Sequence, residues 1–301
     1  MPLKGVKVSP NPTFAELPDH YKISAEQRKF YDDNGYLVIK QLIDFTSLYS
    51  YKQRFSQISK GLVKTHAAII KEPSLVEKKL NPEDYINKIQ DIAYDDVFIT
   101  YAQHPLLLDV LVQFIGEDIT AVHSMIINKP PGTGRHPPHQ DLFYFPIRPA
   151  EKIIGTWTAI DDVHIDNGCL YVIPGSHKAQ TLYAHGDVPD SGKMYHGILS
   201  EWSLAPEPAR VALEMSPGDT VFFNPYLVHG SGPNVSKNYR KAITFHFASS
   251  HCHYIDVSGT VQEVAAKDIV GVAKKMGYHE LNYQDIWRYK SRLVKGVKSN
   301  L

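Results

Sequence analysis

The first third of the chain carries apolar residues at helical spacing. After Asp44 they recur at steps of three and four residues, which predicts an amphipathic helix that ends near Gly61. Ser24 and Gln27 have the spacing of a capping box, which marks the start of an earlier helix. The helices are expected over 24–34, 44–61, 85–101 and 104–115, and a short strand is expected over 36–39.

After Gly116 the pattern changes to short apolar runs separated by turn signals such as Asp-Asn-Gly and Pro-Gly. The strand candidates are 119–127, 153–160, 169–173, 210–215, 219–223 and 240–247. Many short strands with this punctuation indicate an antiparallel sandwich or jelly roll, and of these we expect the jelly roll, a cupin-like double-stranded β-helix. Two helices are expected near the end, over 261–276 and 283–293.

These elements predict a mainly β fold with flanking helices. Residues 1–22 carry several prolines without periodicity and are expected to form a flexible or extended arm. Residues 23–301 are expected to form one jelly-roll domain, with a helical layer before it and helices after it. No internal repeat divides the chain further.

Composition narrows the class of protein. The chain has 301 residues, 43% of them hydrophobic, and a formal net charge of zero, so nothing in the charge balance favours nucleic-acid or membrane binding. Only Cys169 and Cys252 are present, which disfavours a disulfide framework and favours a reducing compartment. No apolar run predicts a membrane-spanning helix, and the N-terminus lacks the apolar core of a secretory signal.

One motif offers metal ligands. His139 and Asp141 stand two residues apart, so on an extended strand both side chains point to the same face. Two histidines and one carboxylate with open coordination positions form the facial arrangement of non-haem Fe(II) oxygenases. Two further His-x-Asp matches, 164–166 and 185–187, are interpreted as a solvated turn and a solvated loop.

A third ligand must come from elsewhere in the chain. The candidates are His229, His246, His251 and His253. His229 is favoured because it follows a predicted strand, and a jelly roll brings distant strands side by side. Arg240 could then bind a carboxylate through its guanidinium fork, and Ser231 could add a hydroxyl donor. The sequence 251–253 also resembles a metal site, but no partner stands at zinc-finger spacing, so a polar strand end is the simpler interpretation.

With these residues in view, the sequence resembles the phytanoyl-CoA dioxygenase family, whose members depend on Fe(II) and 2-oxoglutarate. The similarity runs from about Gln27 to Leu301. It rests on segments 27–31, 34–40, 127–131, 135–137, 139–142, 167–170, 218–223, 229–232, 240–243, 246–249 and 252–257. So long a set of matches is more than a shared jelly roll explains.

The resemblance implies a role for each matching position. His139, Asp141 and His229 correspond to the iron ligands, and Arg240 and Ser231 to residues that hold the far carboxylate of 2-oxoglutarate. Further cosubstrate contacts are implied for Lys88, Met125, Gln140 and Trp157. Without the family, Lys88 would be interpreted as a lysine on a helix surface, and Met125 and Trp157 as core residues. The implied cofactors are Fe(II), 2-oxoglutarate and dioxygen, with ascorbate as reductant.

The activity implied by the resemblance is hydroxylation of the alpha carbon of phytanoyl-CoA or a similar branched acyl-CoA, a step of fatty-acid alpha-oxidation. One alternative is a related oxygenase that acts on a small alcohol, amino acid or natural product. A halogenase is disfavoured, because the halide needs the coordination position of Asp141. The other alternative is a jelly-roll binding protein without catalysis, which an incomplete ligand set would have favoured.

The last three residues of the sequence suggest a targeting signal. Ser299-Asn300-Leu301 resembles the Ser-Lys-Leu peroxisomal signal, with asparagine at the usually basic position. The N-terminal import signal known in some family members is not visible. We therefore expect a peroxisomal protein whose flexible, exposed tail is bound by an import receptor.

Overall fold

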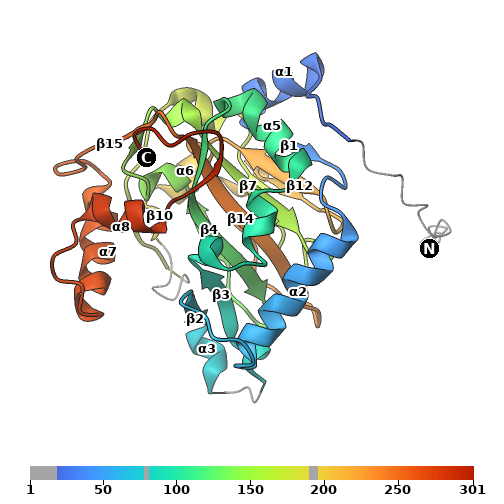
Figure 1. Ribbon diagram of the computed structural model, residues 1–301. Coiled ribbons are helices and arrows are strands. Elements are labelled where there is room, and N and C mark those ends of the chain that lie inside the picture. Colours follow the sequence, from blue (N-terminus) through green and yellow to red (C-terminus); the bar gives the residue numbers. More distant parts are fainter. Residues whose placement is uncertain (1–18, 78–80, 190–195) are drawn as a thin grey trace.

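Two antiparallel sheets face each other in the computed structural model, which describes residues 19–77, 81–189 and 196–301 (Figure 1). The larger sheet has the strand order β1 (Tyr36–Ile39), β12 (Thr220–Phe223), β7 (Ile153–Ala159), β14 (Arg240–Ser249), β4 (Ile119–Lys129), β3 (Ile86–Gln90) and β2 (Ala68–Lys71), with β16 (Arg292–Lys295) also paired to β4. The smaller sheet has the order β11 (Val211–Leu213), β8 (Leu170–Val172), β13 (His229–Ser231) and β5 (His136–His139). This is the jelly roll that the sequence predicts.

Two short ribbons and a set of helices complete the fold. The ribbons are β9 (His185–Asp187) with β10 (His196–Ile198), and β6 (Ile147–Arg148) with β15 (His253–Tyr254). The α-helices are α1 (Ala25–Asn34), α2 (Phe45–Ser59), α3 (Pro73–Val76), α4 (Ile99–Ala102), α5 (Pro105–Ile115), α6 (Glu201–Leu204), α7 (Glu263–Lys275) and α8 (Tyr283–Lys290). Single 3-10 turns span Pro82–Asp84, Ile92–Tyr94, Asp141–Phe143, Ala150–Lys152, Ser176–Ala179 and Glu207–Ala209. None of the described helices has the length and apolar character needed to cross a membrane.

The pleat of the larger sheet separates an apolar face from a mixed one. Side chains alternate between the two faces of a strand, and directly paired residues share a face. Ile243 of β14 pairs with Ile126 of β4, and both join the core cluster that also contains Tyr51 and Phe55 of α2. Figure 1 shows α2 lying along this side of the sheet. The helical layer therefore covers the outer face.

The inner face carries the polar side chains. Along β14 and β4, the register pairs Arg240 with Lys129, Thr244 with Met125 and His246 with His123, so all six residues face the smaller sheet. The next strand, β7, adds Trp157 opposite Thr244. The space between the two sheets is thus where polar chemistry is possible.

Most of the predicted elements are confirmed. Helix α1 begins with the predicted capping box between Ser24 and Gln27, and α2 begins after Asp44, whose carboxylate accepts the Ser47 backbone N–H at 2.9 Å. The predicted strands correspond to β1, β4, β7, β8, β11, β12 and β14, and the predicted C-terminal helices correspond to α7 and α8.

Three of the predicted elements are wrong. The helix expected over 85–101 is instead strand β3, a 3-10 turn and the short helix α4. Asp91 stops any helix there, because its backbone is left-handed, with φ of 65°. Residues 292–293, expected at the end of a helix, begin strand β16, and residues 185–187, expected as loop, form β9.

The tail predicted to be flexible and exposed is exposed over residues 296–300, but its last residue is not. Leu301 is only 6% exposed and belongs to a core cluster with Val122 and Trp287. The backbone N–H of Asn300 donates to the Ser250 carbonyl at 2.8 Å, and the Asn300 side chain donates to the His251 carbonyl at 2.9 Å. The end of the chain is therefore packed against the domain. The arm predicted over 1–22 falls outside the described residues except for 19–22, where the Tyr21 N–H donates to Asp109 of α5 at 2.9 Å.

Gly155 of β7 provides a test of the packing between the sheets. A Cβ at this position would lie 2.4 Å from the Phe223 ring, whose other contacts include His229 at a centroid distance of 4.9 Å. We expect Gly155→Ala to lower the free energy of unfolding by about 1–3 kcal/mol through overpacking. Gly134→Ala is the matched control, since a Cβ there meets nothing within 4 Å. Urea denaturation of both variants measures the difference, and equal stabilities would contradict this packing.

Candidate metal centre

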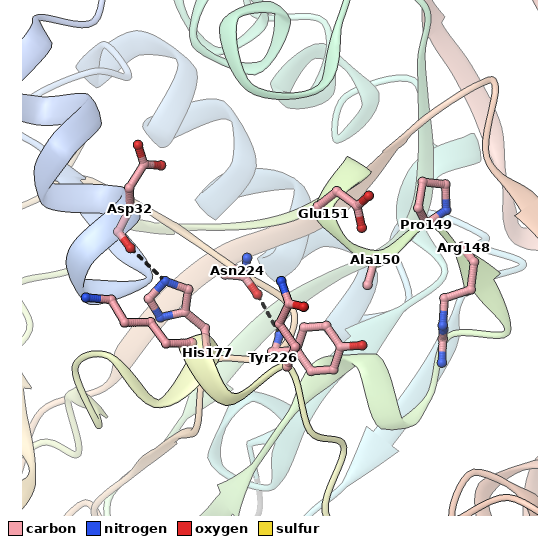
Figure 2. A pocket seen from close by; sticks show the side chains of 10 residues that line it. Asp32, Arg148, Pro149, Ala150, Glu151, His177, Asn224 and Tyr226 are labelled. Carbon is pink, nitrogen blue, oxygen red and sulfur yellow. Dashed lines mark hydrogen bonds between the residues drawn. The ribbon is translucent and has the colours of Figure 1, made fainter.

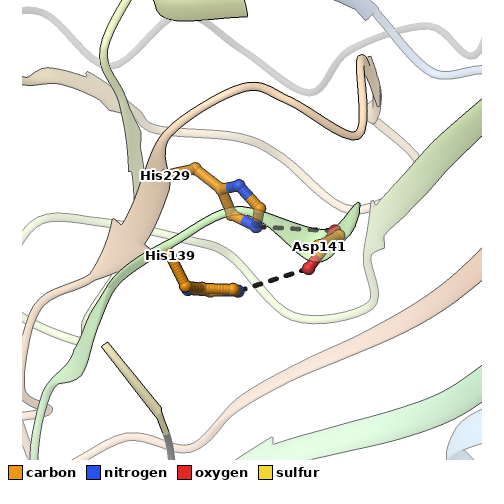
Figure 3. Close-up of side chains that lie close together, drawn as sticks. All are labelled: His139, Asp141 and His229. Carbon is orange, nitrogen blue, oxygen red and sulfur yellow. Dashed lines mark ion pairs between the residues drawn. The ribbon is translucent and has the colours of Figure 1, made fainter. Parts of the chain in front are cut away.

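Three side chains from β5, β13 and the turn after β5 meet between the sheets (Figure 3). His139 and His229 are directly paired across β5 and β13, so their rings lie on the same face, and Asp141 follows two residues after His139. One ligand atom from each lies within 4.8 Å of the others, and all three residues are buried. Within the described part of the chain this is the one such group of histidine, cysteine and acidic residues. The structure thus brings together the three residues that the sequence predicts as metal ligands.

Both histidines are held in the form that binds a metal. The Nδ1 atom of His139 lies 2.9 Å from the Pro137 carbonyl, and Nδ1 of His229 lies 2.9 Å from the Leu227 carbonyl. A carbonyl can only accept, so each Nδ1 carries the proton and each Nε2 keeps its lone pair. Burial lowers the pKa of His229 to about 4, which keeps this ring neutral at physiological pH.

Asp141 is held in its ionised form by histidines. Its Oδ2 lies 2.7 Å from Nε2 of His246, and its Oδ1 lies 3.3 Å from Nε2 of His139. Burial alone would raise the pKa of Asp141, but His246, through its charge and its hydrogen bond, holds that pKa well below the usual value. A charged carboxylate is the form that completes a metal site with two neutral imidazoles.

His246 therefore has a different place from the one considered in the sequence. It was a candidate for the third ligand, but it bonds Asp141 from β14 and stacks on His123 at 5.8 Å between ring centroids. This contact orients the carboxylate. The strand alternation contained a signal for it, because His246 lies six residues after Arg240 and so shares its face.

The other histidine motifs lie outside the cluster. His251 is exposed and pairs with Asp118 at 2.9 Å, and His253 is exposed as well. Asp166 lies in a turn, as predicted. His185, predicted in a solvated loop, is only 3% exposed, and burial lowers its pKa to about 3. That prediction failed because β9 packs His185 against Phe143, with ring centroids 4.3 Å apart.

Gln140 lies between His139 and Asp141 in the sequence, but its side chain is bonded to the surrounding backbone. Its amide group donates to the carbonyls of Thr181 and Tyr226 at 2.9 and 2.8 Å and accepts the Tyr183 N–H at 2.9 Å. Its backbone N–H donates to His185 at 3.0 Å. These bonds use both amide hydrogens and the amide oxygen, so the implied contact of Gln140 with a cosubstrate finds no support in the structure.

Residues suited to an anionic cosubstrate line the same inner face. Arg240 is buried, donates to the Gly168 carbonyl at 2.8 Å and lies 5.2 Å from the centre of the Trp157 ring. Ser231 lies two residues after His229, so both side chains point the same way. The Nε1 atom of Trp157 is buried, and no described residue accepts its hydrogen bond. A buried donor beside a guanidinium fits a bound carboxylate.

Lys88 and Met125 lie further along the same face. Lys88 is on β3 opposite Ile127, and Met125 is on β4 opposite Gln90, so both point toward the inner space. Burial, followed by the charge of Lys290, lowers the pKa of Lys88 to about 8. Lys88 is therefore a strand residue near the site and not a lysine on a helix surface.

A separate surface cavity of about 490 Å³ lies on the side of α1 (Figure 2). It is lined by Asp32, Arg148, Pro149, Ala150, Glu151, His177, Lys178, Gln180, Asn224 and Tyr226, and none of the three candidate ligands lines it. Arg148 is engaged with the Phe145 and Ile147 carbonyls and with Gln262. The cavity is therefore distinct from the metal centre.

Comparisons with known proteins agree with this geometry. The model of the phytanoyl-CoA dioxygenase family matches residues 31–242. The human protein "Phytanoyl-CoA dioxygenase, peroxisomal" is 43% identical, with 94% of this chain and 86% of that protein covered. The Caenorhabditis elegans "Probable phytanoyl-CoA dioxygenase" is 42% identical, with 93% and 95% covered.

The fold resembles solved 2-oxoglutarate enzymes. EctD from S. alaskensis, solved with 2-oxoglutarate and 5-hydroxyectoine, superposes with a TM-score of 0.61 at 22% identity, covering 76% of this chain and 77% of that one. Since the family model and both relatives extend across the predicted ligands, the chain belongs to the phytanoyl-CoA dioxygenase family.

Proposed function

We propose that this protein is an Fe(II)- and 2-oxoglutarate-dependent dioxygenase that hydroxylates the alpha carbon of phytanoyl-CoA or a similar branched acyl-CoA. The observation that carries the proposal is the buried group of His139, Asp141 and His229 on the inner face that also holds Arg240. The names of the relatives support the substrate class. The runner-up is a related oxygenase with another small-molecule substrate.

Each residue of the site has a separate proposed role. The two imidazole Nε2 atoms and the Asp141 carboxylate would hold Fe(II) from one side, which leaves coordination positions open on the other. Arg240, Ser231 and Trp157 would bind the far carboxylate of 2-oxoglutarate, and Lys88 and Met125 would contact the cosubstrate from β3 and β4. His246 keeps Asp141 ionised and oriented. Because the site lies between the two sheets, water is excluded from the reacting groups.

The bound iron and cosubstrate supply the oxidation. Together they would couple the hydroxylation of the substrate's alpha C–H bond by dioxygen to the conversion of 2-oxoglutarate into succinate and carbon dioxide. Ascorbate would serve as the reductant that keeps the iron ferrous. The protein's own contribution is to orient the acyl chain and to prevent oxidation of the wrong carbon.

The substrate class is tested by a panel of acyl donors. With Fe(II) and 2-oxoglutarate present, we expect succinate formation to be coupled to hydroxylation with phytanoyl-CoA and other branched acyl-CoAs, and not with the matching free acids. Mass spectrometry of the acyl product and assay of succinate measure the ratio of the two. Coupled turnover of a free acid, an amino acid or an alcohol, with none of any acyl-CoA, would favour the runner-up.

The ligand set is tested by substitution. His139→Ala or His229→Ala should abolish Fe(II)-dependent turnover, because each removes one of three metal ligands, while the circular dichroism spectrum of the jelly roll is retained. His251→Ala is the matched control, since the exposed side chain of that histidine bonds Asp118 and lies outside the metal centre. Turnover near the wild-type level in both ligand variants would rule out the assignment.

We also propose that the protein resides in the peroxisome and that an import receptor binds Ser299-Asn300-Leu301. The relatives named peroxisomal support this location. Because Leu301 is packed in the core cluster, the receptor must bind the tail after it has left the Ser250 carbonyl, or before the domain folds.

The peroxisomal location is tested with a fluorescent protein fused at the N-terminus. The intact fusion should appear in peroxisomes, and deletion of Leu301 should disperse it through the cytosol. Val297→Ala is the control, since this tail residue is 64% exposed and should leave the pattern unchanged. Thermal melting of the deletion variant separates lost recognition from lost folding. A cytosolic pattern for the intact fusion would refute the proposed peroxisomal location.

A further inference from the structure

Lys129 is a buried cation that none of the assigned roles uses. It is the last residue of β4 and is 4% exposed, and its partner across the ladder is Arg240, which is 2% exposed. Directly paired residues share a face, so both long basic side chains point toward the space between the sheets. Two cations therefore lie next to each other in the interior.

The Lys129 side chain leads toward the candidate cosubstrate site. Its Nζ donates to the Ser231 hydroxyl at 3.2 Å. Its stem lies against Gly168, where an added Cβ would come 2.7 Å from the lysine Cε. The carbonyl of the same Gly168 accepts the Arg240 guanidinium at 2.8 Å. Both cations therefore contact Gly168, and the lysine also contacts Ser231.

A buried lysine ammonium such as that of Lys129 is stable only beside a negatively charged group. Among the described residues no carboxylate forms an ion pair with its ammonium. Burial, followed by the charge of Arg240, places the pKa of Lys129 well below the usual value, against the opposing influence of Glu72 and Cys169. Burying two like charges is unfavourable unless a counter-charge joins them.

Lys241, on the strand paired with that of Lys129, is a second buried lysine with a different environment. It is also buried, at 3% exposed, but it points to the opposite face of β14, toward α2. There it has a protein carboxylate, because its Nζ lies 3.4 Å from Glu83. A buried lysine on the outer face is neutralised by the fold, whereas the one on the inner face is directed at a binding site.

We propose that Lys129 is a second cation for the far carboxylate of 2-oxoglutarate, which it binds together with Arg240 and Ser231. This inference rests on the proposed function. The carboxylate accepts from the guanidinium fork and from the ammonium, so it is held from two neighbouring strands. The site then selects an acid with a charged far end over one with an apolar end.

Binding measured without turnover tests this role. Protein loaded with Fe(II) under anaerobic conditions is titrated by calorimetry with 2-oxoglutarate and with 2-oxopentanoate, which has a methyl group in place of the far carboxylate. Lys129→Met should lower the affinity for 2-oxoglutarate by roughly 10- to 100-fold, the range for a lost bond to a charged group. The affinity for 2-oxopentanoate should not change, and Lys129→Arg should restore part of the loss.

Controls separate this role from simpler ones. Lys241→Met removes a buried lysine from the outer face and should leave the binding of both acids unchanged. If Lys129 acted only by holding Ser231, Lys129→Met would cause no further loss of affinity in a Ser231→Ala background, and that result would overturn the proposal. Equal losses for both acids, or no loss for either, would overturn it as well. Failure of the wild-type Fe(II) protein to bind 2-oxoglutarate would instead refute the proposed function on which this inference depends.

Discussion

The pairing of β4 with β14 is the constraint on which the rest of the structure depends. This long ladder fixes which side chains of two central strands face the helices and which face the smaller sheet. A slip by one residue would turn Ile243 and Phe245 toward the interior space and Arg240 and His246 toward the helices. Apolar burial on the outer face, at about 25 cal/mol for each Å² removed from water, therefore also positions the polar groups of the inner face. Stability and function share one register.

The metal centre adds a second constraint, because its polar groups are buried. An unpaired carboxylate in this position would be strongly unfavourable, and Asp141 is instead bonded to His246 at 2.7 Å. The carbonyls of Pro137 and Leu227 fix the two candidate imidazole ligands in one tautomer. Such a network holds the ligand atoms in place before a metal arrives, which reduces the ordering required on binding. Asp141 and His229 are far apart in the sequence, but their side chains are positioned close together because β5 and β13 are direct neighbours in the sheet.

The sequence predicted those parts that depend on local pattern. The periodicity after Asp44 predicted α2, and the family motifs predicted His139, Asp141 and His229, which the structure brings together. Contacts between distant segments were missed. Strand β3 forms because β4 and β2 pair with it on either side, and no local pattern distinguished it from a helix. The docking of Leu301 depends on the Ser250 carbonyl and on a cluster assembled from β4, α8 and the turn after Asp141. The role of His246 likewise required the register of β14.

The central claim is that three side chains hold one Fe(II) with positions left open for 2-oxoglutarate. Anaerobic equilibrium dialysis of the wild-type protein with Fe(II) and labelled 2-oxoglutarate measures both components in one experiment. We predict one iron bound per chain and one 2-oxoglutarate bound per iron, with binding of the acid strongly weakened when the metal is withheld. Equally tight binding of 2-oxoglutarate with and without iron, or the absence of a bound iron, would contradict it.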